Sequence, residues 1–110
     1  MGVANRAKAY HVLTSAGWAE SVEFYLGSEE SPDDVSEMDI RLILKPPHIQ
    51  AVDLSQYVSV DAHVVTWTIP EAVTETWPAG DARLELNVRP AASTVDRHTF
   101  LATAKIQKGL

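Results

Sequence analysis

Acidic side chains cluster in one segment of the chain, and carboxylates are the groups that hard cations bind. Calcium sites take six to eight oxygen ligands from a loop of regular spacing, usually with a glycine at the sharp turn. The segment has no Asp-x-Asp-x-Asp-Gly pattern, so we predict a solvated acidic loop and no metal site. Its acidic residues are Glu29, Glu30, Asp33, Asp34, Glu37 and Asp39.

Asp61 and His63 form the second candidate group, because residues two apart share one face of a strand. A carboxylate beside an imidazole can begin a metal site or orient a catalytic base. Two groups are too few for either site, and His11, His48 and His98 lie far apart in the sequence. We interpret the histidines as surface or hydrogen-bonded side chains. A small hydrolase or metal-dependent enzyme using Asp61 and His63 is the least favoured alternative.

Signatures of covalent and phosphate chemistry are missing from the sequence. No serine lies in a Gly-x-Ser-x-Gly elbow, and no Gly-x-Gly-x-x-Gly or P-loop pattern occurs. The chain has no cysteine, which excludes thiolate nucleophiles, thiolate metal sites and disulfides. We predict a protein that is not an enzyme and needs no cofactor.

The charge balance argues against nucleic acid and membrane surfaces as partners. The formal net charge is −6, and the nine Lys and Arg residues are scattered. Phosphate backbones and anionic lipids both favour clustered cations. No apolar run approaches the roughly 20 residues of a membrane helix, and residues 1–9 lack the apolar core of a signal peptide. The lack of cysteine suits folding in a reducing cytoplasm.

Alternation of polar and apolar residues predicts the elements that position these side chains. It is clearest at residues 83–89, where Leu84, Leu86 and Val88 share one face of a strand. Pro70 begins the one candidate helix, a single turn over residues 70–77. Six or seven short strands separated by turns favour a sandwich or barrel over an α/β fold. The other predicted strands are residues 8–14, 22–26, 38–45, 64–69 and 100–106, with a short one at 49–54.

One domain accounts for residues 1–110, because a chain of this length suits a single hydrophobic core. Hydrophobic residues make up 45% of the sequence, which argues against general disorder. We expect mobile ends at residues 1–7 and 108–110, and docking arms at residues 1–9 and 107–110 that order upon assembly. The predicted core consists of Leu42, Leu44, Trp67, Ile69, Leu84, Leu86, Val88 and Phe100.

Three aromatic residues, Trp18, Tyr25 and Tyr57, are candidates for an exposed interface. Trp18 follows a glycine at a predicted loop, and exposed tryptophan is enriched at binding hot spots. Core packing is an equally good interpretation of Trp18. Trp67 lies in the middle of a predicted strand and Trp77 before a turn, so both favour the core.

Two short elements between residues 52 and 88 combine into one pattern. Asp53-Leu54-Ser55 precedes a strand, and a turn then leads into the alternating strand at 83–89. A threonine hydroxyl can brace such a turn, a tryptophan can close the core, and a glycine permits a backbone angle that other residues resist. The residues of this structural turn motif are Thr74, Trp77, Pro78 and Gly80.

This pattern resembles small immunoglobulin-like β-sandwich proteins of tailed bacteriophages and prophages, found among tail, baseplate, connector-associated and other virion components. That group often has an aromatic residue soon after the turn glycine, whereas Asp81 follows it here. The resemblance implies an antiparallel immunoglobulin-like sandwich of about seven strands with one short helical turn. It also implies a non-enzymatic structural protein of the virion, made and folded in the host cytoplasm.

Protein–protein contact is the mechanism expected for such a role. Edge strands of a sandwich have unpaired backbone groups that accept a strand of another chain. We expect binding to other virion proteins and self-association in a symmetric or ring-like assembly of the tail or connector region. The first alternative is a stand-alone carbohydrate- or peptide-binding module, which requires exposed aromatic residues gathered on one surface.

Overall fold

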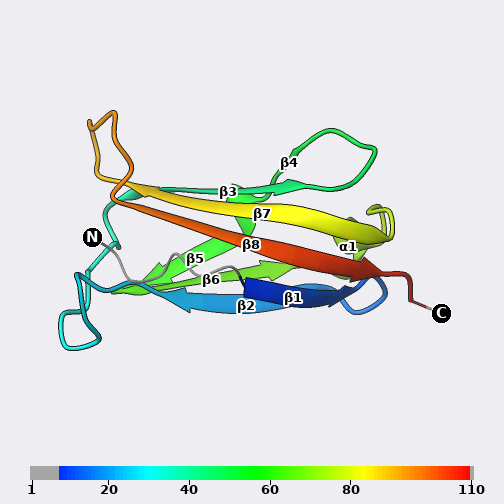
Figure 1. Cartoon of the computed structure of the whole chain (residues 1–110), viewed down its shortest axis with the longest axis horizontal. Coiled ribbons are helices and arrows are strands. Elements are labelled where there is room, and N and C mark those ends of the chain that lie inside the picture. The colour runs from blue at the N-terminus through cyan, green and yellow to red at the C-terminus, as the bar shows by residue number, and fades with distance from the viewer. Residues whose placement is uncertain (1–7, 110) are drawn as a thin grey trace.

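Eight β-strands and two short helical turns form the part of the chain that the computed structural model describes, residues 8–109. The turns are a 3-10 turn, η1 (Ser55–Tyr57), and α1 (Glu71–Thr74). Figure 1 shows the strands running lengthwise in two layers. The strands are β1 (Lys8–Leu13), β2 (Trp18–Glu23), β3 (Asp39–Lys45), β4 (Val52–Asp53), β5 (Val58–Asp61), β6 (Val64–Ile69), β7 (Gly80–Arg89) and β8 (His98–Gln107).

Backbone hydrogen bonds divide the strands into two sheets. The large sheet has five strands in the order β1-β8-β7-β3-β4, and the small sheet has three in the order β2-β6-β5. An immunoglobulin-like sandwich distributes its strands in this way, with β3, β7 and β8 in one sheet and β2, β5 and β6 in the other. The predicted all-β sandwich is confirmed, as is the short helical turn, for which Pro70 is the N-cap residue.

One pair of strands departs from the antiparallel expectation. β1 pairs with β8 in parallel, with Tyr10 beside Ala104 and Val12 beside Ile106. No tight turn joins these two strands, because β1 leads instead into β2 of the small sheet. The hairpin geometry that imposes antiparallel pairing on neighbouring strands therefore does not act on this pair.

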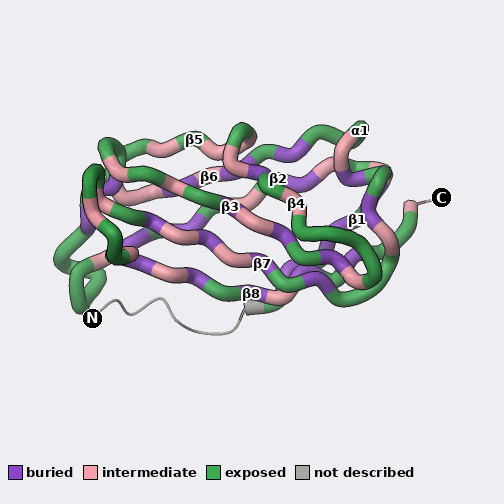
Figure 2. Tube along the Cα trace, turned by 90° about the horizontal axis from the view of Figure 1, so that it is seen from above, coloured by how far each residue is buried: buried purple, intermediate pink, exposed green. Residues whose placement is uncertain are grey.

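Period-two alternation places the apolar side chains between the sheets. All members of the predicted core are buried, and buried and exposed positions alternate along the strands (Figure 2). At the centre, Tyr10 packs edge-on against Trp18 and Trp67, with ring centroids 5.7 and 5.8 Å apart. Trp77 packs edge-on against Trp18 at 6.2 Å. Edge-to-face pairs of this kind stabilise a core beyond simple area burial.

Two predicted strands have wrong boundaries, and a third strand, β5, is missing from the prediction. The strand expected at 22–26 is β2, which begins at Trp18 and ends at Glu23, while Leu26 is exposed. The strand expected at 49–54 is reduced to Val52–Asp53. β5 and β6 form a hairpin in which Asp61 pairs with Val64. Its two-residue turn is Ala-His, which lacks the Asn-Gly or Asp-Gly signal of such turns.

The chain ends are partly incorporated into the sandwich. Residues 8 and 9, expected in a docking arm, begin β1, and Gln107 ends β8. Thr14 donates its backbone N–H to the Gln107 carbonyl (3.0 Å), and the Gly109 N–H donates to Thr14 Oγ1 (3.0 Å). The expectations for residues 1–7 and 110 lie outside the described residues.

Candidate functional site

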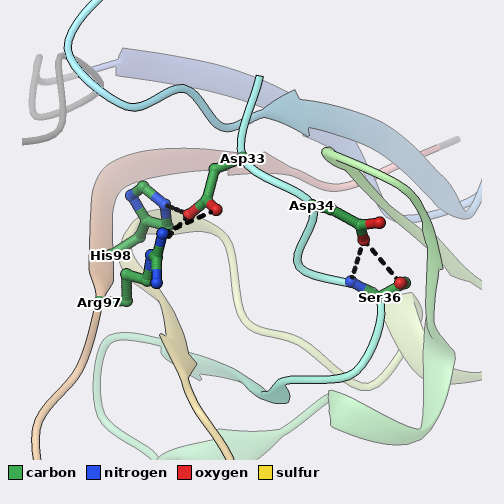
Figure 3. Close-up of polar contacts among 5 residues, drawn as sticks. All are labelled: Asp33, Asp34, Ser36, Arg97 and His98. Atoms are coloured by element: carbon green, nitrogen blue, oxygen red, sulfur yellow. Dashed lines mark hydrogen bonds and ion pairs between the residues drawn. The ribbon is translucent and has the colours of Figure 1, made fainter. Parts of the chain in front are cut away.

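A buried carboxylate, Asp33, is the centre of a polar cluster at the end of the sandwich that carries the β2–β3 and β7–β8 loops. Arg97 donates to it from Nε and Nη2, at 2.9 and 3.1 Å. His98, the first residue of β8, is bonded to it through Nε2 at 2.6 Å. Figure 3 shows Arg97 and His98 converging on Asp33, with Asp34 directed away from them.

The burial of this cluster limits what it can do chemically. The Asp33 side chain is 5% exposed and that of His98 4%, whereas Arg97 is 38% exposed. The His98 ring also stacks on Phe24, with centroids 4.6 Å apart. In hydrolases an Asp–His pair activates a hydroxyl on the other ring nitrogen; within residues 8–109 no hydroxyl is hydrogen-bonded to His98. The arrangement is a clamp that joins two loops.

Backbone hydrogen bonds connect the same end of the sandwich to a third loop. Phe24 donates its N–H to the carbonyl of His63 (2.9 Å), and Val35 donates to that of Ala62 (2.9 Å). Asp33 also donates its own N–H to the Phe24 carbonyl (3.0 Å). The long β2–β3 loop is therefore fixed to the β5–β6 turn as well as to the start of β8.

The remaining acidic residues of this loop are exposed, as expected. Ser36 donates its hydroxyl (2.6 Å) and its backbone N–H (2.9 Å) to Asp34 Oδ1. These hydrogen bonds hold the pKa of Asp34 below its ordinary value. The expectation of a solvated side chain is wrong for Asp33, because its carboxylate is buried against Arg97 and His98. Among residues 8–109, no three acidic or histidine side chains are placed to hold a metal ion.

The sequence pattern predicted that Asp61 and His63 share one strand face, and this prediction is wrong. Asp61 ends β5, and His63 lies in the following turn, where Ala62 adopts a φ of +54°. His63 Nε2 instead approaches Glu23 Oε1 at 3.4 Å. His63 therefore contacts Glu23 and not Asp61, and the pair does not form the base–orienter or metal site that the sequence pattern suggested.

The structural turn motif lies at the opposite end of the sandwich, before β7. The Thr74 hydroxyl is buried and donates to the Thr14 carbonyl at 2.7 Å, which joins α1 to the end of β1. Trp77 is buried at this end of the core, and Pro78 is half-buried beside it. Gly80 has a φ of +134°, a conformation that side-chain-bearing residues rarely adopt.

The Asp-Leu-Ser element braces the end of β4 against β3 within the large sheet. Ser55 donates its backbone N–H to Asp53 Oδ1 (2.9 Å), and Leu42 of β3 donates its N–H to Ser55 Oγ (3.0 Å). Leu54 between them is fully buried. The hydrogen bonds from Ser55 lower the pKa of Asp53. These contacts give the element a structural role at the edge of the sheet.

The three candidate interface aromatics do not gather on one surface. Of the two interpretations of Trp18, the structure shows core packing: the residue is 6% exposed, because β2 begins there and turns the indole into the core. Tyr25 is half-buried near the loop end and donates its hydroxyl to Glu23 Oε1 (2.8 Å). Tyr57 is half-buried in η1 and packs against the core.

Two surface hollows, of about 360 and 600 Å³, lie near the start of β3. Ligand pockets of that size are usually lined by apolar and aromatic side chains. The first is lined by Asp39, Ile40, Arg41, Asn87, Arg89 and Asp96. The second is lined by Asp34, Ser36, Glu37, Met38, Pro90 and Ala91. Charged and polar residues make up most of the first lining and half of the second. Over residues 8–109, no helix has the length and apolarity to cross a membrane.

The sequence reasoning missed the Asp33 cluster, although one signal for it was present. The alternation at Phe100, Ala102, Ala104 and Ile106 continues back to His98, which places that histidine on the inward face. A buried polar side chain requires a hydrogen-bond partner. The pattern could therefore have indicated a partner for His98, although not which residue supplies it.

These features define an immunoglobulin-like sandwich whose polar clusters secure its loops. The fold is similar to the N-terminal domain of phage TP901-1 ORF48, with a TM-score of 0.57 and 7% sequence identity over 94% of this chain and 91% of that domain. It is also similar to CopC from Methylosinus trichosporium OB3b, with a TM-score of 0.50 and 14% identity over 96% of this chain and 90% of that one. No protein-family model and no curated protein sequence matches the chain.

Proposed function

We propose that this protein is a non-enzymatic structural component of a tailed-phage or prophage particle that acts through contacts with other virion proteins and with itself. The observation that carries the proposal is the shared fold with a domain of a phage protein, which extends over nearly the full length of both chains. The Asp-Leu-Ser element and the turn motif independently resemble small virion sandwich proteins.

The chemistry of the described residues supports a role in assembly. The Asp33–His98 pair is buried against Arg97 and Phe24, so a substrate cannot reach it without opening the loop end. His63 lies in the β5–β6 turn, and its Nε2 approaches Glu23 and not Asp61. The sandwich instead offers broad sheet faces and edge strands, which are surfaces suited to protein contacts. Nucleic acid and membranes are not among the partners proposed, because the cations of the chain are scattered.

Purified particles provide the direct test. The source strain is induced or infected, the particles are purified on a density gradient, and the chain is quantified by mass spectrometry against the major tail protein. We expect the chain at a fixed copy number that survives repeated purification. Its absence from particles that contain their other tail and connector proteins would overturn the proposal.

A further inference from the structure

The β7–β8 loop presents an aliphatic side chain to solvent on a well-fixed backbone. Val95 is 69% exposed, the highest value among the exposed large hydrophobic residues of the described chain. Ser93 Oγ accepts the Val95 N–H (3.1 Å) and donates to the Val95 carbonyl (3.2 Å), and the Ser93 N–H donates to the Pro90 carbonyl (3.1 Å). At the base of the loop, Arg89 and Asp96 form an ion pair at 2.9 Å. Because these contacts hold the backbone around Val95, a partner that buries its side chain pays little conformational entropy.

The β2–β3 loop presents a second aliphatic side chain at the same end of the sandwich. Leu26 is 49% exposed, and its backbone N–H donates to the Ser31 carbonyl at 2.7 Å. Both loops project beyond the strands at this end, which we call the loop end (Figure 1). The bond from Arg97 to Asp33 joins one loop to the other. The clamp therefore limits how far Leu26 and Val95 can move relative to each other.

The hollow of about 600 Å³ lies between the same two loops, because residues of both loops line it. Asp34 and Glu37 of the β2–β3 loop contribute carboxylates, and Met38 and Pro90 contribute apolar surface. A lysine or arginine side chain matches such a lining, since its apolar stem can pack on the apolar part while its charged head meets the carboxylates.

Negative charge without a local cation dominates the loop end. The β2–β3 loop contains no lysine or arginine, and Arg97 at the end of the β7–β8 loop is already bonded to Asp33. A surface of one sign attracts a partner of the opposite sign and speeds their encounter. Five exposed carboxylates of this end form no ion pair with a described residue: Glu29, Glu30, Asp34, Glu37 and Asp61.

We propose that the loop end is the surface by which this chain binds a neighbouring virion protein, and that this partner presents a basic surface with apolar depressions. Val95 and Leu26 enter the depressions. A lysine or arginine of the partner enters the hollow between the loops, toward Asp34 and Glu37. The inference rests on the proposed virion role and assigns that role a contact surface.

A second copy of this chain matches the loop end less well than a basic protein does. Its cations Lys45 and Arg83 lie side by side toward the opposite end of the sandwich. That end also carries the exposed carboxylates of Glu71, Glu75 and Asp81, so its surface has both signs of charge. Two loop ends facing each other would bring their unpaired carboxylates together, which is unfavourable at an interface. The basic surface therefore belongs to a different protein.

Competition for incorporation into particles tests this surface on the full chain. The wild type and one variant are produced together in the induced or infected host, and mass spectrometry compares their ratio in the lysate with their ratio in purified particles. Val95→Asp places a charge in an apolar contact and Glu37→Lys repels the partner's basic side chain, so each should be depleted at least about 10-fold in particles. Ile49→Asp and Glu75→Lys are the matched controls at exposed sites of the opposite end, and should be incorporated within about twofold of the wild type.

Incorporation of Val95→Asp or Glu37→Lys at the level of the wild type overturns the inference and leaves the virion role in place. Depletion of a control variant to the same extent overturns it as well. Both loop-end variants should unfold in urea with the wild-type midpoint, because both side chains are exposed. In sedimentation velocity, a wild-type homo-oligomer that Val95→Asp dissociates would assign the loop end to a second copy and refute the basic partner. Absence of the wild type itself from particles would refute the virion role.

Discussion

Replacing Asp33 with alanine removes the carboxylate that holds the β2–β3 loop against the start of β8. The substitution deletes three hydrogen bonds, two from Arg97 and one from His98. Arg97 is 38% exposed, so its guanidinium can turn to water after the change. His98 is only 4% exposed, and its Nε2 then lacks a partner in a buried position.

The expected loss of stability follows from these two exposures. A buried polar group left without its partner costs about 1–3 kcal/mol, and the partly exposed ion pair with Arg97 contributes about 1 kcal/mol at most. Together they give a decrease of about 1–4 kcal/mol in the free energy of unfolding. At about 4 °C per kcal/mol for a domain of this size, Tm should fall by about 4–16 °C.

Urea unfolding monitored by tryptophan fluorescence measures this effect, because Trp18, Trp67 and Trp77 are all buried and report on the core. Glu30→Ala in the same loop is the control, since that side chain is exposed and surface changes of this kind stay within about 0.5 kcal/mol. A double-mutant cycle of Asp33→Ala with Arg97→Ala should give a coupling energy of about 1 kcal/mol. An Asp33→Ala variant as stable as the Glu30→Ala control would falsify the clamp.

Three further predictions concern single side chains. Thr74→Val keeps the shape of the residue but loses the buried 2.7 Å hydrogen bond to Thr14, so the free energy of unfolding, measured by thermal unfolding, should fall by about 1–2 kcal/mol. Thr76→Val, at an exposed site, is the control and should change stability little. Equal effects of the two substitutions would contradict the role given to Thr74. The pKa of Asp53 is lowered by Ser55, so the stability it contributes is complete above its unfolded pKa of about 3.9 and is lost as pH falls through the lower folded pKa. In an NMR titration, Ser55→Ala should raise the pKa of Asp53 and leave that of Asp34 unchanged, while Ser36→Ala should do the reverse; parallel shifts would argue against these local causes. Burial, and secondarily Glu20, raises the pKa of Tyr10 to about 12, so its contribution is complete below pH 10 and is lost as pH rises through about 12. An ultraviolet titration should therefore lose its highest-pH tyrosine step in Tyr10→Phe, and an unchanged titration would contradict the assignment.

Much of the fold could be predicted from alternation alone. Residues two apart in a strand point to the same side, so the run at Leu84, Leu86 and Val88 identified inward positions without knowledge of their partners. Pro70 marked the start of α1 because its fixed φ and missing N–H are tolerated there. The turn before β7 was found in the same way, from residue types with strong backbone preferences.

The candidate site was less predictable, because its residues meet only through the fold. Asp33 lies in an acidic loop where every neighbouring carboxylate is exposed, and nothing local distinguishes it. Its partner Arg97 is 64 residues away in the sequence. Trp18 was also ambiguous, because a residue beside a glycine can belong to a loop or begin a strand. Its burial depends on where β2 pairs with β6.

The sequence by itself determined which side chains of the alternating run at 83–89 face inward, where the short helical turn begins, and that cysteine chemistry is absent. Those properties depend on backbone geometry and composition, which are local. Only the tertiary structure decided the parallel pairing of β1 with β8, the burial of Asp33 and the placement of Lys45 beside Arg83. Each of these depends on strand register between segments that are distant in the chain, and side-chain alternation within a strand does not specify which strand becomes its neighbour.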